Sequence, residues 1–199
     1  MQKPVPKYLT PEEYLVREEI ATHKSEYYQG EIFAMAGNTI DHNRIVRNLT
    51  EQLNRSFENK NCEAFNENVR LCIDTMQFFA YPDILVVRGK IEFYENRRDT
   101  LLNPILIVEV LSDSTENYDR GQKFKFYRSV PTMREYLLID QYKIRLEQFS
   151  LGQQGKWMLS DYDGAEAILY CTSIDFQIPL REIYHRVEFE RAEGRGPRG

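Results

Sequence analysis

Two acidic residues occur in or beside stretches of sequence that are otherwise apolar. Asp83 precedes the apolar segment 84–87, and Glu109 interrupts the apolar segment 104–111. Burying a carboxylate without a partner costs several kcal/mol, so each acid is expected beside a cation or a strong hydrogen-bond donor. A divalent metal ion is one such cation. The alternative is structural: Asp83 caps the turn after Pro82, and Glu109 pairs with an arginine or a lysine.

A lysine and a tyrosine could join these carboxylates. Asp119, Lys123 and Tyr127 are spaced i, i+4 and i+8, so on a helix their side chains share one face. If that face looks toward the strand carrying Glu109, an ammonium and a phenol join the two acids. The alternative is an ordinary surface ion pair between Asp119 and Lys123, which the spacing alone favours and which contributes little to stability.

Several enzyme classes lack their usual marker in this chain. No P-loop, HExxH, GxSxG or paired CxxC motif occurs. The three cysteines, Cys62, Cys72 and Cys171, are far apart and do not have the spacing of a zinc site or a disulfide framework. The candidate chemistry is therefore that of the carboxylates.

The composition predicts one globular unit in a reducing compartment. The 199 residues (23.7 kDa), of which 42% are hydrophobic and 13% aromatic, suffice for one well-filled core. We expect a single domain over residues 1–190, followed by a mobile tail over 191–199 that lacks an apolar anchor. The N-terminus carries no apolar signal segment, and the apolar stretch 104–108 is too short to span a membrane. We therefore expect a cytoplasmic protein that is not inserted in a membrane.

The order of the predicted elements indicates an α/β sandwich built on a mixed sheet, rather than a repeat array. The segment 104–111 is so uniformly apolar that it should be a central strand covered on both faces. Four strands between residues 62 and 87 are predicted to be consecutive members of one sheet. In chain order we expect a helix over 11–19 capped by Thr10, a hairpin over 26–28 and 31–35, a helix over 42–57 capped by Asp41, strands over 62–65, 69–73, 78–81, 83–87 and 104–111, a helix over 118–130, a strand over 135–140, a hairpin over 143–151 and 156–159, a strand over 167–170 and a short helix over 180–184.

Several short blocks follow one another in an order that is more specific than any one block. They are residues 28–37 with His42-Asn43, then Tyr81-Pro82-Asp83-Ile84, then residues 107–112 with Thr115, Asp119, Lys123 and Tyr127, and finally Glu135-Tyr136-Leu137. Over residues 8–184 the chain resembles the Uma-type restriction endonuclease family, a branch of the PD-(D/E)XK nuclease superfamily. The resemblance implies a restriction-endonuclease-like α-β-β-β-α-β core with additional β-hairpins, which agrees with the predicted order of elements.

The resemblance also implies roles for the candidate residues. Asp83 and Glu109 correspond to the acids that ligate Mg²⁺, for which Mn²⁺ can substitute. The superfamily usually has its lysine two residues after the Glu, where this chain has Leu111. Lys123 stands where the Uma-type pattern has its lysine, so we expect Lys123 to orient the attacking water or stabilise developing negative charge.

Three further residues are candidates for supporting roles. Glu31 is predicted to be a third acid near the metal, and Tyr127 a phenol beside the carboxylates. His42 lies at the start of a predicted helix, where it could contact phosphate. A capping or packing role is the favoured alternative for His42, because a lone histidine is a weak signal.

Nucleic-acid contacts would have to come from a local patch, because 26 Lys and Arg against 31 Asp and Glu give a net charge of −5. Arg120, Lys125 and Arg128 lie on the same predicted helix as Lys123 and could form a positive stripe for phosphates. The alternative is a solvated helix face. Aromatic residues near Glu31, namely Tyr27, Tyr28 and Phe33, could stack on bases, although such residues more often fill a core.

Two functions are consistent with these patterns. The first is a Mg²⁺-dependent DNA endonuclease, expected as a homodimer because two related sites cut both strands. The second is a catalytically inactive nucleic-acid-binding or regulatory protein that retains the nuclease fold, which the negative net charge and Leu111 favour.

Overall fold

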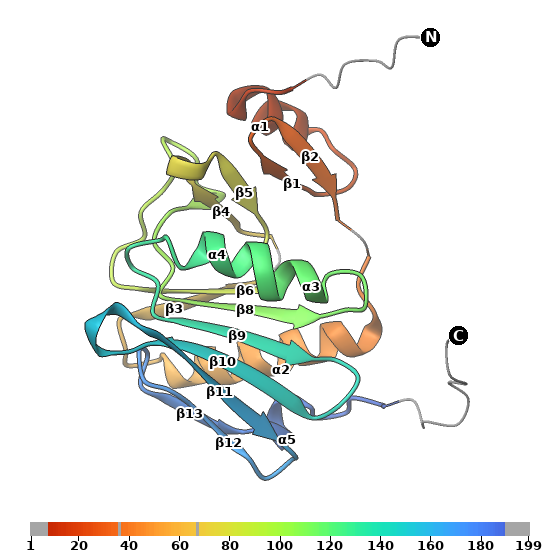
Figure 1. The fold of residues 1–199 in the computed structure, drawn as a ribbon, viewed down its shortest axis with the longest axis vertical. Helices are drawn as coiled ribbons and strands as arrows, with labels where there is room; N and C mark the ends of the chain where they lie inside the picture. Colours follow the sequence, from red (N-terminus) through yellow and green to blue (C-terminus); the bar gives the residue numbers. More distant parts are fainter. Residues whose placement is uncertain (1–7, 36, 67, 190–199) are drawn as a thin grey trace.

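The protein is built around a six-stranded mixed sheet (Figure 1). The computed structural model describes residues 8–35, 37–66 and 68–189, so the tail predicted over 191–199 lies outside the described residues. In spatial order the strands are β11-β10-β9-β8-β6-β3. Their bounds are β3 Cys62–Asn66, β6 Ile84–Arg88, β8 Leu106–Leu111, β9 Glu135–Asp140, β10 Arg145–Leu151 and β11 Trp157–Asp163.

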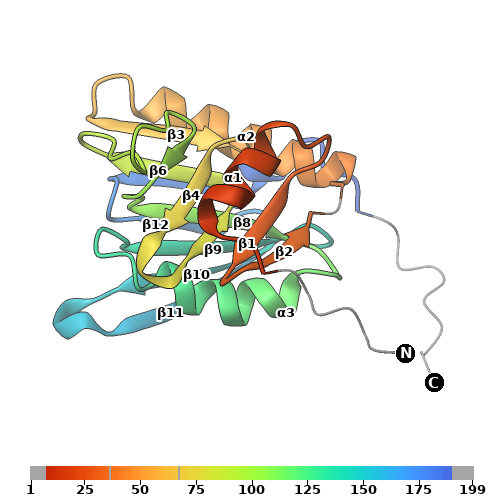
Figure 2. The same ribbon diagram turned by 90° about the horizontal axis from the view of Figure 1, so that it is seen from above.

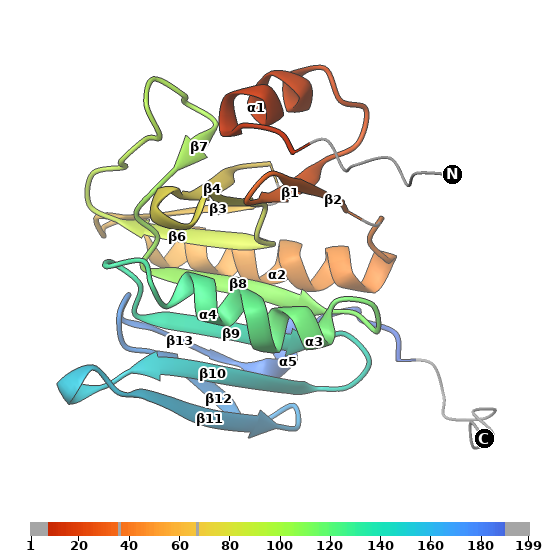
Figure 3. The ribbon, with the colours of Figure 1, turned by 45° about the horizontal axis from the view of Figure 1, so that its top comes forward.

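Two helical layers cover this sheet, as Figures 2 and 3 show. Helix α2 (Ile40–Ser56) lies on one face. The other face carries one continuous helix, formed by α3 (Glu116–Tyr118), a π-helical turn (Asp119–Lys123) and α4 (Phe124–Tyr127). Strand β6 pairs antiparallel with β3 and β8, and β8 pairs parallel with β9. The order α2-β3-β6-β8-α3/α4-β9 confirms the predicted α-β-β-β-α-β core.

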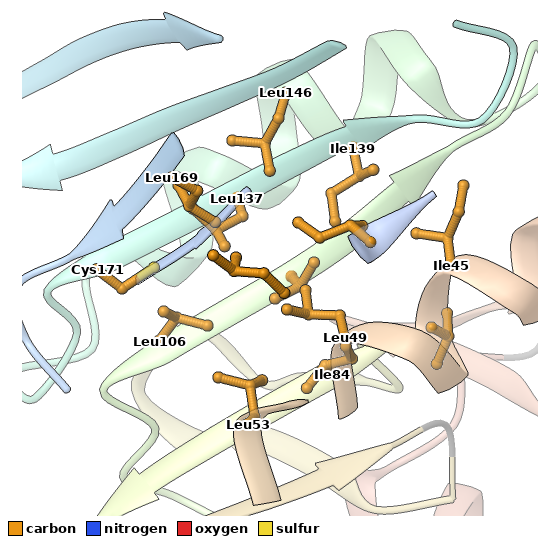
Figure 4. Close-up of a cluster of buried hydrophobic side chains, with 14 of the residues drawn as sticks. Ile45, Leu49, Leu53, Ile84, Leu106, Leu137, Ile139, Leu146, Leu169 and Cys171 are labelled. Carbon is orange, nitrogen blue, oxygen red and sulfur yellow. The ribbon is translucent and has the colours of Figure 1, made fainter. Parts of the chain in front are cut away.

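The central strand β8 alternates its side chains between the two faces, as the period of a strand requires. Leu106, Val108 and Val110 join the core against α2, part of which Figure 4 shows. Ile107 and Leu111 join the core on the opposite face, against α4. All six residues of β8 are buried, which confirms the predicted central strand covered on both faces.

A second sheet packs against the α4 side of the first one. Its strands lie in the order β2-β1-β5-β4-β7, and apolar residues of β4 and β5 share a core with α4, β6 and β8. Helix α1 (Pro11–Glu19) packs on β1 and β5. The bounds are β1 Ser25–Tyr28, β2 Glu31–Ala34, β4 Arg70–Ile73, β5 Phe78–Ala80 and β7 Thr100–Leu101.

The prediction that the strands between residues 62 and 87 form one sheet is therefore wrong. β3 and β6 pair directly with each other, and the β4-β5 hairpin between them turns away into the second sheet. A tight turn with Gln77 in the left-handed conformation (φ 48°) closes that hairpin. Apolar alternation marks a strand but does not state which sheet the strand joins.

Several helices and strands also differ in detail from prediction. Thr39, not Asp41, caps α2, because its Oγ1 accepts a hydrogen bond from the backbone N–H of His42. Asp41 instead pairs with Arg44 at 2.8 Å. The helix predicted over 118–130 begins at Glu116, ends at Tyr127 and contains the π turn. A terminal strand β13 (Phe176–Pro179) pairs with β12 (Ile168–Cys171) and was not predicted; it leads into α5 (Leu180–Ile183).

The described residues contain no helix that is both long and apolar enough to cross a membrane.

The buried carboxylate of Glu135 ties the start of β9 to the β12-β13 turn. It accepts hydrogen bonds from the backbone N–H groups of Thr172 (3.0 Å) and Ser173 (3.2 Å), from the Ser173 hydroxyl, and from Gln148 Nε2 (3.0 Å). Replacing Glu135 with Ala leaves these donors unpaired, so we expect the free energy of unfolding to fall by about 3 kcal/mol.

Urea unfolding followed by far-UV circular dichroism measures this loss. Glu63→Ala is the matched control, because Glu63 is exposed on β3 and its loss should change stability by less than about 0.5 kcal/mol. Equal midpoints for Glu135→Ala and Glu63→Ala would show that the Glu135 contacts do not stabilise the fold.

Candidate active site

Glu109 points from the middle of the sheet toward the α3-α4 helix. It lies between Ile107 and Leu111 on the α4-facing side of β8 and is only 4% exposed. Two donors from the helix reach its Oε1 atom: the Tyr127 hydroxyl at 2.8 Å and Lys123 Nζ at 3.1 Å. The side chain that breaks the apolar strand is thus a buried carboxylate held by a cation and a phenol.

Asp83 lies beside Glu109 because β6 and β8 are antiparallel neighbours. Ile84 pairs with Val108, so the same register places Asp83 opposite Glu109. Asp83 Oδ2 accepts a hydrogen bond from the backbone N–H of Val110 at 2.7 Å, and His42 Nε2 lies 3.2 Å from the same oxygen. Asp83 is therefore held by contacts from β8 and from α2, which places His42 beside it.

Lys123 is the centre of a buried cluster of carboxylates. Its Nζ lies 2.9 Å from Glu26 Oε1, 3.1 Å from Glu109 Oε1 and 3.3 Å from Asp119 Oδ1. Lys123 and its three partners are all at most 6% exposed. The helix face carrying Asp119, Lys123 and Tyr127 looks inward as the spacing allowed, and the alternative of a surface ion pair between Asp119 and Lys123 is wrong.

Carboxyl groups outnumber cations in this cluster, because three of them surround the single ammonium of Lys123. Burial raises the pKa of Glu109 well above its ordinary value, and the nearby Asp119, Asp83 and Glu26 raise it further while Lys123 opposes the rise. Burial likewise raises the pKa of Asp119. Burial works against the charged form of Lys123, but the surrounding carboxylates outweigh it and hold the Lys123 pKa above its ordinary value. The site therefore favours an additional cation.

Asp83 and Glu109 each have a carboxylate oxygen that could coordinate Mg²⁺. Among the described residues, the hydrogen bonds to Glu109 fall on Oε1 and those to Asp83 fall on Oδ2. Each acid thus keeps a second oxygen that can serve as a ligand. In the same part of the chain, no group of three His, Cys, Asp or Glu side chains is arranged to hold a metal ion. Mg²⁺ needs only one or two carboxylates, because waters and a substrate phosphate complete its coordination.

These acids line one cavity of about 510 Å³. Glu26, Asp83, Glu109 and Asp119 contribute to its wall with Lys123. Aromatic side chains surround the acids, including Phe33, which is 45% exposed. The other aromatic members of the wall are Tyr28, Tyr81, Tyr118 and Tyr142. The cavity wall therefore combines buried acids with aromatic side chains.

The structure places Glu26, not Glu31, at the cluster. Glu31 is exposed on β2 at the hairpin turn and does not line the cavity. Glu26 of β1 pairs in register with Phe33, and both residues line the cavity. The hairpin was predicted correctly. Its sequence has one acid near the open end, Glu26, and one beside the turn, Glu31, and does not indicate which of them faces the α3-α4 helix.

The predicted positive stripe does not reach the cavity. Arg120 pairs with Glu116 at 3.0 Å and also with Glu147. Lys125 and Arg128 are exposed, and none of the three basic residues lines the cavity wall. Their positions match the alternative of a solvated helix face.

Two residues that prediction missed connect the sheet to α2. Gln141 follows β9 directly; its Nε2 donates to the Leu111 carbonyl at 2.8 Å, and its Oε1 accepts from Thr39 Oγ1 at 2.6 Å. Thr39 in turn caps the helix that carries His42. The only sequence signal for Gln141 is its position after a buried strand, which is too general to identify it.

Sequence comparison places these residues in a family. The Uma2 family model, described as "Putative restriction endonuclease", matches residues 11–181. A protein of Synechocystis sp. (strain ATCC 27184 / PCC 6803 / Kazusa), named "Uncharacterized protein sll1609", is 42% identical over 161 residues, which are 81% of this chain and 91% of the relative. A second protein of that strain, "Uncharacterized protein slr1290", is 33% identical over 188 residues, 94% of this chain and 96% of the relative.

A solved structure shares the fold. The crystal structure of "a putative nuclease belonging to DUF820" from Anabaena variabilis ATCC 29413 superposes with a TM-score of 0.71 at 18% sequence identity. The match covers 88% of this chain and 97% of the Anabaena chain. The chain therefore shares the fold of the Anabaena protein, and the sequence match over 11–181 assigns the family. This chain belongs to the Uma2 family.

Proposed function

We propose that this protein is a Mg²⁺-dependent endonuclease that hydrolyses DNA phosphodiester bonds, with Mn²⁺ able to replace Mg²⁺. One observation carries the proposal: adjacent strands bring Asp83 and Glu109 into one cavity, each with an oxygen left for a ligand, beside the Lys123 ammonium. Membership of the Uma2 family and the nuclease-like fold support a nuclease function.

The residues of the site have separable tasks in this reaction. A bound Mg²⁺ supplies a Lewis acid for the phosphate and lowers the pKa of a coordinated water. Asp83 and Glu109 would hold the ion, and the Val110 N–H and the Tyr127 hydroxyl fix the orientation of the two carboxylates. Lys123 stays protonated beside its carboxylates and stabilises negative charge that develops on the attacked phosphate.

We further propose that the enzyme acts as a homodimer in the cytoplasm. Two symmetry-related sites allow both strands of a duplex to be cut within one complex. Cys62, Cys72 and Cys171 are all free thiols, which is the usual state of cysteines in a reducing compartment.

Nicking of supercoiled plasmid tests the proposed activity. The purified protein is expected to convert plasmid to open-circular and linear forms with Mg²⁺ or Mn²⁺, and to leave it intact in EDTA. A doubly substituted protein, Asp83→Asn with Glu109→Gln, purified in parallel, controls for contaminating nucleases and should be inactive.

The alternative is a catalytically inactive nucleic-acid-binding protein, and the same experiment separates the two. Absence of metal-dependent cleavage of plasmid, single-stranded DNA and RNA, together with retained binding of an oligonucleotide, would establish the inactive protein. Cleavage that persists in the doubly substituted protein would assign the activity to a contaminant.

A further inference from the structure

A second cavity adjoins the acidic one on the other side of Asp83. Its volume is about 580 Å³. Six residues line both cavities, including Asp83, Tyr81 and Thr39; the others are Met35, Gly37 and Asn38. The two cavities therefore adjoin at the proposed metal ligand Asp83, and we refer to the second one as the Lys24 cavity.

The wall of the Lys24 cavity differs in charge from the acidic cavity. Asp83 is its only carboxylate among the described residues, whereas four acids line the neighbouring cavity. Lys24 supplies a positive charge, and His23 and Asn43 add hydrogen-bonding groups. The remaining polar members are Thr22, Asn38 and Thr39. The wall is therefore less acidic than that of the neighbouring cavity and offers hydrogen-bond donors.

The position of Lys24 is defined by a buried tyrosine. Its ammonium lies over the Tyr81 ring, 5.3 Å from the ring centroid. The Tyr81 hydroxyl accepts a hydrogen bond from Arg70 Nε at 2.9 Å and donates one to Glu18 Oε1 at 3.2 Å. Tyr81 is two residues before Asp83, so this anchored ring holds the Lys24 charge against the wall that carries the proposed metal ligand.

A nucleic-acid strand carries a negative charge at every phosphate, so the two cavities differ in how well they could accept a second phosphate. A phosphate bound beside Asp83 and Glu109 would have further phosphates of the same strand on either side of it, and both cavities adjoin Asp83. The acidic cavity repels a second phosphate, because its four carboxylates outnumber the one ammonium of Lys123. The Lys24 cavity repels it less, because its wall has one ammonium and, among the described residues, a single carboxylate, that of the proposed metal ligand Asp83.

We propose that the Lys24 cavity binds a phosphate of the cut DNA strand next to the phosphate that is attacked. Lys24 contacts this phosphate through its charge, and Asn43 contacts it through a hydrogen bond. The proposal rests on the proposed endonuclease function and adds the subsite that sets the direction of the bound strand.

DNA binding under non-cleaving conditions tests the subsite. Fluorescence anisotropy of a labelled single-stranded oligonucleotide, titrated with Ca²⁺ present at several salt concentrations, gives affinity and its salt dependence. Lys24→Met keeps a long unbranched side chain but removes the charge, so we expect binding to weaken about 3–10-fold and the log–log salt slope to decrease by about 0.7. Lys24→Arg should restore both.

Two further variants keep the test specific. Lys125→Met removes an equally charged lysine that lines neither cavity, and it should leave affinity and slope unchanged. Asn43→Asp places a negative charge in the Lys24 cavity from an exposed position on α2, so it should weaken binding without disturbing the core. The variants are compared after circular dichroism confirms equal folding.

The outcomes separate this subsite from the proposed function. If the wild-type protein cleaves DNA and both Lys24→Met and Asn43→Asp bind with wild-type affinity and salt slope, the subsite is wrong and the endonuclease stands. If the wild-type protein neither binds nor cleaves DNA, both proposals fail. If duplex DNA shows the Lys24 effect as strongly as single-stranded DNA, the subsite holds for both forms.

Discussion

Replacing Glu109 with Gln is expected to lower Mg²⁺-dependent DNA cleavage by about 10²–10³-fold while the protein remains folded. Glutamine keeps an oxygen that accepts hydrogen bonds from Tyr127 and Lys123, but it removes the charge that would hold the metal. Asp83→Asn should lower cleavage to a similar extent, because it also removes a charge that would hold the metal. The protein should stay folded, because the amide oxygen still accepts a hydrogen bond from the Val110 N–H. Plasmid nicking rates under single-turnover conditions measure the loss.

Calorimetric titration with Mn²⁺ gives an independent measure of the same site. Each substitution should weaken Mn²⁺ binding more than about 10-fold, because even residues that only support a metal ligand change affinity by that amount. Glu31→Gln is the matched control; this exposed acid does not line the cavity, so cleavage and Mn²⁺ binding should stay at the wild-type level. Wild-type cleavage by Glu109→Gln would refute the assignment of Glu109 as a ligand.

The contrast between Glu31 and Glu26 shows where sequence reasoning reaches its limit. Asp83 and Glu109 could be identified because a carboxylate beside or within a buried strand violates the apolar pattern that the fold otherwise obeys. Glu26 violates no such pattern, since it begins a short hairpin strand that could be exposed. Its partner Lys123 is distant in the sequence, and the second sheet brings the two together.

The second sheet was also the part of the fold that could not be predicted. The α-β-β-β-α-β core follows from helix caps, apolar periodicity and one fully buried strand. The β4-β5 hairpin has the same alternation as its neighbours, and only tertiary packing against α4 assigns it to another layer. Likewise the spacing of Asp119, Lys123 and Tyr127 predicted a shared face, but not whether that face was buried.

Replacing Lys123 with Met is expected to lower the free energy of unfolding by about 3–5 kcal/mol at pH 8. Methionine fills much of the lysine volume but leaves Glu26, Glu109 and Asp119 without their cation. Urea unfolding can be followed through the single tryptophan, Trp157, whose ring contacts Phe124 of α4 with centroids 5.4 Å apart. Lys125→Met, a substitution at an exposed position of the same helix, should change stability by less than about 0.5 kcal/mol.

The pH dependence of this loss identifies its electrostatic origin. Burial already raises the pKa of Glu109 above its ordinary value of 4.5, and removing Lys123, which lowers that pKa, raises it further. A carboxyl with a raised folded-state pKa binds more protons when folded. Its stabilising effect is therefore complete below the unfolded-state pKa and is lost as pH rises through the folded-state pKa. The destabilisation by Lys123→Met should thus be smaller at pH 5 than at pH 8, by more than about 1 kcal/mol.

A second substitution separates lost charge pairing from lost packing. In the Lys123→Met background, Glu109→Gln removes one of the unpaired buried charges, so it should recover part of the stability at pH 8 and little at pH 5. A purely steric effect of the Lys123→Met substitution would instead give the same loss at both pH values and no recovery from Glu109→Gln. Lys123 contacts three carboxylates from three different elements, so Glu109→Gln still leaves Glu26 and Asp119 without their cation. We therefore expect this one substitution to recover only part of the lost stability.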